Sequence, residues 1–554
     1  MNSRHILAAI AAVFLLLPLA AQDQSNTIDQ TQTQNQAQET EFVSVFGAQL
    51  PQLDPQRAIF SNEAQIQTAL YEGLFSYDPQ SLDPIRALAQ SWERSADKKL
   101  YRFTIRENAR WSDGTPITAE DFVGSWFRML DLNADYATFF DVIVGAKAYR
   151  EAKGSEKNKE SVGIKAIDAR TLEVTLVRPV AYFTRLLCHQ SFALIHPSLY
   201  KVKDWRSAIP YPVDGPYKPV SMTDSELMLE KNDQYWDAAN VHIPKLRMIF
   251  TDDDAKATSL FNTGYAHWLD GPGNFDQILL QTAIQYFPIY STHYWFFNCR
   301  IAPWSDQRVR RALALLLPWD SIRSSDLYRL PATTLVLPLP GYSKTKGIEA
   351  PNRDEALKLL ADAGFPNGAG LPEVTIAYAD YATPRSIATA FKTAWEKEIG
   401  LKVTLKPMVP ATYYETIGNR ADASSFTLAH ETWIGDFADP EAFLQMWTTG
   451  APLNISGYSD QVFMNFMEQS YSAGDDARMQ LLSKAETELL QSGACLPIYH
   501  NFAASVIDTD YIEGWYQNAL DIHPYKYFAF GTPSVNPNVV RADLAQPSLV
   551  ALSK

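Results

Sequence analysis

The stretch VTIAYADYATPRSIATAFKTAWEKEIGLKVTLK, residues 374–406, carries the pattern that decides the fold class. Apolar runs predict strands at 374–378 and 401–406, and apolar residues at helical spacing predict a helix over 386–399 between them. A strand, a helix and a second strand in this order usually form parallel strands with a right-handed crossover, and ligands favour the carboxyl ends of such strands. The chain is therefore predicted to be α/β.

A region earlier in the chain predicts further strands and another helix. Tyr101, Phe103 and Ile105 alternate as on a half-buried strand, and residues 172–176 repeat that alternation. Thr118, followed three residues later by an aspartate, is a good N-cap for a helix. Strands of this kind beside a crossover unit predict mixed sheets.

The length of the chain predicts more than one lobe. It has 554 residues, whereas one hydrophobic core usually supports about 250 to 300. The chain is 46% hydrophobic, so it can fill several cores. It shows no internal repeat and no obvious linker. We therefore expect lobes built from non-contiguous segments and crossed by several connections, a topology that suits a hinge.

The first forty residues predict an exported protein. Arg4 and His5, an apolar run from 6 to 17 and the small residues before 22 make residues 1–21 a predicted signal peptide. Residues 22–40 are polar and Gln-rich and are predicted to form a disordered leader. No cysteine follows the small residues, so we expect a freely diffusing periplasmic protein rather than a lipoprotein.

Charge and cysteine usage exclude several classes of function. The formal net charge of −15 argues against a nucleic-acid partner, because neutralising phosphates needs clustered Lys and Arg. Cys188, Cys299 and Cys495 are odd in number and widely separated, which excludes a disulfide framework and the common zinc spacings. One oxidised pair and three free thiols both stay open.

Catalytic motifs are missing from the sequence. The chain has no GxSxG, GxxxxGK or HExxH motif, and its nine histidines are scattered. Asp436 and Asp439 suggest a glycosidase pair, but they are only three residues apart and Pro440 follows at once. We therefore expect no enzyme activity, no metal site and no cofactor.

Ten stretches, in order along the chain, decide the class. With them the chain resembles the extracellular solute-binding proteins of the oligopeptide, dipeptide and nickel transport group, and most of all the periplasmic oligopeptide-binding proteins. The stretches are LDP (53–55), YEGL (71–74), ALAQSWE (87–93), YRFTIRENARWSDGTPITAEDFVGSW (101–126), VGIKAIDARTLEVTL (162–176), DGPYK (214–218), EKNDQYWD (230–237), APWSDQRVRRAL (302–313), ALKLLADAGF (356–365) and WIGDFADP (433–440).

The resemblance implies a periplasmic binding protein fold of type II, with two ligand-gripping lobes joined by a hinge and a third lobe packed on one of them. Projected onto this chain, lobe II is 74–192, lobe III is 291–502 and a tail covers 541–554. Lobe I combines three segments: 41–73, 193–290 and 503–540.

The implied function is that of the substrate-binding subunit of an ABC importer. Such a subunit captures short peptides in the periplasm and delivers them to a permease in the inner membrane, acting as a monomer. Because the family also contains binders of nickel chelates, haem or oligosaccharides, a different solute on the same scaffold is the alternative. An exported hydrolase is a third, weaker hypothesis.

The resemblance assigns roles to residues near the motif W-x-G-D-[FY]. Its aspartate, here Asp436, grips the amino terminus of the peptide in relatives, and Trp433 corresponds to their pocket aromatic. Tyr136 lies where relatives place a tyrosine near the bound backbone. The residues aligned with a disulfide of some relatives are Ser291 and Ile434, so that bond cannot form.

The carboxylate end of the ligand is the weaker part of the match. Some relatives carry an arginine three residues before the motif tryptophan, but this chain has His430, which is only partly cationic near neutral pH. Arg420 is a candidate substitute from the preceding segment. Trp295, in an aromatic run at the entry to lobe III, is a further candidate for ligand contact.

Overall fold

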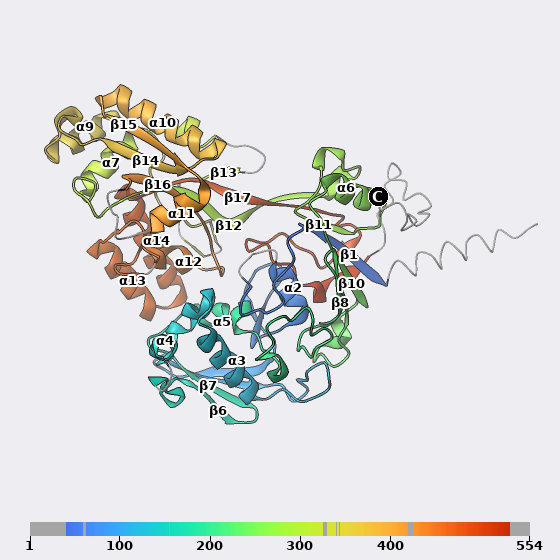
Figure 1. The fold of residues 1–554 in the computed structure, drawn as a ribbon. Helices are drawn as coiled ribbons and strands as arrows, with labels where there is room; N and C mark the ends of the chain where they lie inside the picture. Colours follow the sequence, from blue (N-terminus) through green and yellow to red (C-terminus); the bar gives the residue numbers. More distant parts are fainter. Residues whose placement is uncertain are drawn as a thin grey trace, which may run out of the picture.

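A computed structural model describes residues 40–58, 63–153, 156–324, 329–339, 341–342, 344–418, 425–451 and 453–531. The predicted signal peptide, the leader up to residue 39, the tail and Arg420 lie outside the described residues. We keep the names lobe I, lobe II and lobe III for the segments defined above, whose boundaries stay a prediction. Figure 1 shows lobe III, lobe I and lobe II as three bodies around the middle of the molecule.

Lobe I carries the N-terminal part of a large mixed sheet. Its β1 is paired in parallel with β10 and β11, while β9 and β8 extend the sheet antiparallel. The elements are β1 (Glu41–Phe46), α2 (Glu63–Leu70), β8 (Tyr217–Met222), β9 (Glu226–Lys231), β10 (Lys245–Phe250), α6 (Asp254–Asn262), β11 (Trp268–Asp270), β18 (Ile512–Glu513) and β19 (Ala529–Phe530).

Lobe II has its own antiparallel sheet in the order β4-β5-β7-β6, covered by α3. The predicted strand at 101–105 is β5, and the predicted cap of α3 is present: the Thr118 amide donates to Asp121 Oδ2 at 2.7 Å. The elements are β2 (Phe75–Tyr77), β3 (Pro84–Arg86), β4 (Ala89–Arg94), β5 (Leu100–Ile105), α3 (Ala119–Leu132), the 3-10 helix η1 (Asp135–Val142), α4 (Ala146–Glu151), β6 (Ile164–Asp168), β7 (Thr171–Thr175) and α5 (Phe183–Leu186).

Lobe III contains the crossover unit that the sequence predicted. β14 and β15 are parallel with Val374 opposite Val403, and α10 connects them. The helix begins at Ala382, four residues before its predicted start, because Pro384 is tolerated in a first turn. The elements are α7 (Gln307–Leu315), α8 (Trp319–Ile322), β13 (Arg329–Pro331), α9 (Arg353–Asp362), β14 (Val374–Ala379), α10 (Ala382–Ile399), β15 (Val403–Met408), α11 (Pro410–Gly418), β16 (Leu428–Ile434), α12 (Glu441–Leu444), α13 (Gln461–Ser472) and α14 (Asp475–Gln491).

Two long strands connect lobe I with lobe III. β12 (Ile284–Phe297) and β17 (Cys495–Ile507) pair antiparallel along the span that Figure 1 shows between the two lobes. The pairing shifts register between Pro288 and Thr292. A break in the ladder at this point divides the strands into a lobe I half and a lobe III half, as a hinge requires.

The α/β class with mixed sheets is confirmed, and the cysteine alternatives are decided. Cys188, Cys299 and Cys495 are all free thiols. Among the described residues no helix is both long and apolar enough to cross a membrane. The same part of the chain gathers no group of three or more His, Cys, Asp or Glu side chains able to hold a metal ion.

Candidate functional site

The motif aspartate stands at the carboxyl end of β16, held by a glycine that has no room for a side chain. The Gly435 amide donates to the Tyr290 carbonyl at 2.8 Å. A Cβ at Gly435 would come within 2.2 Å of the Tyr290 ring and 2.8 Å of the Phe443 ring. The glycine of the motif therefore lets the chain pass between two aromatic rings and turn Asp436 out of the strand.

Asp436 is a half-buried carboxylate that no cation neutralises within the described residues. Burial raises its pKa to about 6, while a hydrogen bond from the Tyr136 side chain partly offsets that rise. Tyr136 belongs to η1 of lobe II and Asp436 to lobe III, so this hydrogen bond joins two lobes. The arrangement leaves an acidic group prepared for a positively charged partner.

Tyr77 adds a second polar group beside Asp436. Its side chain is 3% exposed, and its hydroxyl has no hydrogen-bond partner in the described part of the chain. Burial raises its pKa, and so do the nearby charges, Asp436 among them. A buried hydroxyl without a partner is costly, and a ligand donor placed between Tyr77 and Asp436 removes that cost.

Aromatic side chains bring lobe II and lobe III together next to Asp436. The Phe437 ring stacks on Tyr182 of lobe II, with 4.9 Å between centroids and 8° between planes. Phe139, also in lobe II, meets Phe437 edge-on at 6.3 Å. Arg178 lies 3.6 Å above the Tyr471 ring, which adds a cation–π contact between the same lobes.

The second aspartate of the motif region is structural. Asp439 is fully buried and receives both terminal nitrogens of Arg478, at 2.8 and 2.7 Å. The same guanidinium also bonds Glu441 at 3.1 Å. Because Asp439 is committed to this buried ion pair, it does not form a catalytic pair with Asp436. The network instead fixes the turn that follows Asp436.

Trp433 supports the motif from within lobe III. Its side chain is half-buried, and its Nε1 donates to the Ala442 carbonyl in α12 at 2.8 Å. Its ring packs on the apolar cluster shared by lobes II and III. The indole thereby ties β16 to α12 on the two sides of Asp436.

Two predicted ligand-contacting residues lie in the interior of lobe III instead. Trp295 is fully buried against the Phe391 ring of α10, at 5.3 Å between centroids. His430 is 4% exposed, its ring stacks on Tyr413, and its Nε2 accepts from the Ala379 amide at 3.2 Å. Burial lowers the pKa of His430 to about 4, so this imidazole is neutral. Contact of these two side chains with a ligand stays a prediction, and the structure places both of them inside lobe III.

The positions aligned with the relatives' disulfide are directly opposite each other. Ser291 of β12 pairs with Ile434 of β16, and the Ser291 hydroxyl receives a hydrogen bond from Asn501 at 2.7 Å. The scaffold of the site is thus held by strand pairing and a polar contact where those relatives carry a covalent bond.

Comparison with known proteins gives this geometry a family. Residues 83–454 match the model of the bacterial extracellular solute-binding proteins, family 5. The chain belongs to this family. It is a solute-binding protein and not an enzyme, because the family consists of binding proteins.

Three relatives illustrate the likeness. The periplasmic oligopeptide-binding protein OppA of Salmonella typhimurium is 30% identical over 489 residues, covering 83% of this chain and 87% of its own. A probable deoxycholate-binding periplasmic protein of Escherichia coli is 28% identical over 470 residues, covering 81% and 85%. The unliganded open form of a periplasmic murein tripeptide-binding protein superposes with a TM-score of 0.74 at 24% identity, covering 89% and 97%. That structure shows the fold alone, and it confirms the predicted periplasmic binding protein architecture.

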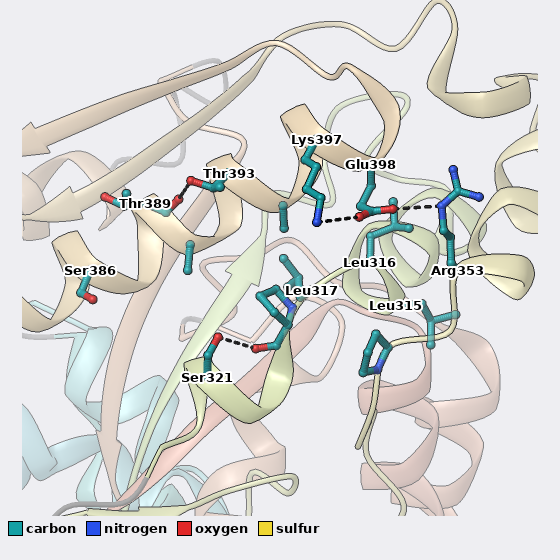
Figure 2. A pocket seen from close by; sticks show the side chains of 14 residues that line it. Leu315, Leu316, Leu317, Ser321, Arg353, Ser386, Thr389, Thr393, Lys397 and Glu398 are labelled. Carbon is teal, nitrogen blue, oxygen red and sulfur yellow. Dashed lines mark hydrogen bonds and ion pairs between the residues drawn. The ribbon is translucent and has the colours of Figure 1, made fainter.

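A surface cavity of this solute-binding protein lies away from Asp436. Its volume is about 620 Å³, and it lies in lobe III between the end of α7 and one side of α10. Figure 2 shows Thr389 and Lys397 of α10 along one wall and Leu317 along the other, with Arg353 paired to Glu398 at the rim. None of the predicted site residues lines it.

Of the lobe II residues around Asp436, sequence reasoning predicted Tyr136 and missed the others. Tyr77, Phe139 and Tyr182 are far from the motif in sequence, and each reads as an ordinary aromatic core residue. Only Phe437 carried a signal, because it directly follows the motif aspartate.

Proposed function

We propose that this protein captures short peptides in the periplasm and delivers them to the permease of an ABC importer. The observation that carries the proposal is the half-buried Asp436 carboxylate, which has no cation partner among the described residues and lies beside the unpartnered Tyr77 hydroxyl. A peptide amino terminus is a cation with three hydrogen-bond donors, so it fits both groups. At about 4 Å such a pair gains roughly 4 kcal/mol at an effective dielectric of 20, against the cost of desolvation.

The backbone next to Asp436 offers a docking edge for an extended chain. In the described residues β16 is paired with β14 at Leu428. Farther along, the Tyr413 hydroxyl accepts from the His430 amide at 2.8 Å and donates to the His430 carbonyl at 2.6 Å. Since backbone groups alternate between the two sides of a strand, those of Thr432 and Ile434 point to the same side. No described strand pairs with them there. A peptide can add to this edge with its amino terminus at Asp436.

Further parts of the proposal concern the carboxylate end and the export of the chain. Arg420 stays the candidate for the ligand carboxylate, since His430 is neutral and buried. We also propose that residues 1–21 are removed on export and that the protein acts as a monomer. The periplasmic names of the relatives support this location. Sequencing the mature N-terminus and measuring the solution mass test both points.

The test of the function is the identity of the bound ligand. The protein is purified from its periplasm, the ligand is released and identified by mass spectrometry, and binding of peptides of two to six residues is measured by calorimetry. We expect peptides, and an Asp436→Asn variant that loses affinity for free-amine peptides but not for their N-acetylated forms. A bile acid, sugar or metal chelate without peptide binding overturns the proposal.

A further inference from the structure

A second acidic group lies on β16, five residues before Asp436. Glu431 faces the same side of the sheet as Trp433 and is directly opposite Tyr294 of β12. The residue is partly exposed to solvent. In the described residues its carboxylate pairs with no cation and accepts one hydrogen bond, from the adjacent Thr432 amide at 3.3 Å. Burial raises its pKa to about 7.

Three tyrosines lie near enough to this carboxylate to be affected by its charge. The pKa values of Tyr294, Tyr413 and Tyr414 are raised, and the charge of Glu431 is one cause in each case. Tyr413 is held in place by its two hydrogen bonds to the His430 backbone, and it meets Tyr414 edge-on at 5.3 Å. Rings around a carboxylate favour a cation, since their faces carry negative potential.

One atom of this group lacks a partner and is deeply buried. Tyr294 is 1% exposed, and its hydroxyl has no hydrogen-bond partner in the described part of the chain. Because Tyr294 and Glu431 are cross-strand partners, their Cβ atoms lie about 4.5–5.5 Å apart. The unpartnered hydroxyl thus belongs to the residue directly opposite Glu431, within range of its charge and separate from the group at Asp436.

Apolar surface borders the group on its exposed side. The carboxyl ends of β14 and β15 lead into Tyr381 and Val409, which are 55% and 69% exposed, and Tyr414 of α11 is 48% exposed. Tyr381 and Tyr414 are close enough that one raises the pKa of the other. A lysine or arginine side chain can pack its methylene groups on such a surface while its charged end reaches Glu431.

We infer that Glu431, with Tyr294, Tyr413 and Tyr414, forms a subsite for a lysine or arginine side chain of the bound ligand. The inference rests on the proposed peptide function and adds the chemistry of a preferred side chain. Strand geometry of about 3.3 Å per residue puts Glu431 roughly 16 Å, or about five residue spacings, along the chain from Asp436. An extended lysine side chain spans about two such spacings, so a peptide anchored at Asp436 and added to the edge of β16 brings its fourth or fifth residue within reach of the subsite.

The experiment compares lysine with its uncharged counterpart. Alanine pentapeptides with a single lysine or norleucine at each of positions two to five are titrated into the intact mature protein by calorimetry. We expect lysine to bind about tenfold or more tightly than norleucine at position four or five, because a partly desolvated pair has this strength. The Glu431→Gln variant should bring that ratio close to one without changing the affinity for the norleucine peptide.

A matched control is the exposed Glu415 of α11. Glu415→Gln removes the same charge from the same part of lobe III and should keep the lysine preference. Melting curves of both variants should match the parent protein.

The outcomes separate the two hypotheses. No binding of any pentapeptide overturns the proposed function. Binding without a lysine preference, or a preference that survives Glu431→Gln, overturns the subsite alone. A loss of preference in Glu415→Gln as well assigns the effect to general surface charge and also overturns it.

Discussion

The pKa of Asp436 makes peptide affinity depend on pH in a calculable way. In the ligand-free protein its pKa is about 6, because burial disfavours the carboxylate and the Tyr136 hydroxyl only partly compensates. A bound ammonium favours the ionised form and lowers the pKa of Asp436 in the complex. The contribution of the Asp436 carboxylate to the affinity is therefore complete near pH 7 and is lost as the pH falls through 6. From pH 7 to pH 5 the protonated fraction of Asp436 reduces the affinity about tenfold, or roughly 1.4 kcal/mol.

The assay is calorimetry with an alanine tripeptide at several pH values between 5 and 7, a range in which the peptide amino terminus, with a pKa of about 8, stays charged. The tripeptide has no cationic side chain to pair with Glu431, whose pKa is about 7, so titration of Glu431 does not enter the measured affinity. The Asp436→Asn variant should bind more weakly at pH 7 and show a flat profile. A tenfold loss toward acid pH that persists in Asp436→Asn would refute the role of this carboxylate. So would a flat profile in the parent protein.

Three further predictions concern the structure around Asp436. Gly435→Ala places a methyl group 2.2 Å from the Tyr290 ring, so it should lower the free energy of unfolding in urea by about 1–3 kcal/mol and weaken peptide binding in calorimetry. A Cβ at Gly474 meets nothing within 4 Å, so the control Gly474→Ala should change neither quantity. Arg478→Ala leaves the buried Asp439 without its ion-pair partner and leaves Glu441 with Arg178 alone at 3.6 Å, so it should cost about 3–5 kcal/mol in urea unfolding; a cost below 1 kcal/mol contradicts the proposed ion-pair network. Phe437→Ala removes the ring stack onto lobe II and should speed peptide release about two- to tenfold in stopped-flow measurements, and an unchanged release rate argues against closure through this contact.

The local elements could be predicted from the sequence because their signals are local. The alternation at Tyr101, Phe103 and Ile105 gave β5, and the Thr118 cap gave the start of α3. The crossover of β14, α10 and β15 followed from hydrophobic periodicity alone, apart from the first turn of the helix. In each case the deciding residues lie within about twenty positions of one another.

The site could be predicted only in part, because it is assembled from distant segments. Asp436 was identifiable through its motif, whereas Tyr77 depends on a contact over more than three hundred residues. His430 and Trp295 were assigned to the ligand because a strand has two faces and the sequence does not say which one is covered. In the structure α10 packs on Trp295 and α11 packs on His430, and neither contact is readable from the local sequence.

The position of Asp436 couples ligand binding to the arrangement of the lobes. Its carboxylate belongs to lobe III, but its hydrogen-bond donor Tyr136 and the stacking partner of its neighbour Phe437 belong to lobe II. A ligand shifts a conformational equilibrium only through differential contacts with the two states. An ammonium held by both Asp436 and Tyr77 makes contacts on lobe III and lobe II at once, so it stabilises the state in which those lobes meet. β12 and β17 connect lobe I to lobe III across a register shift, so the interrupted ladder lies outside the group of residues around Asp436.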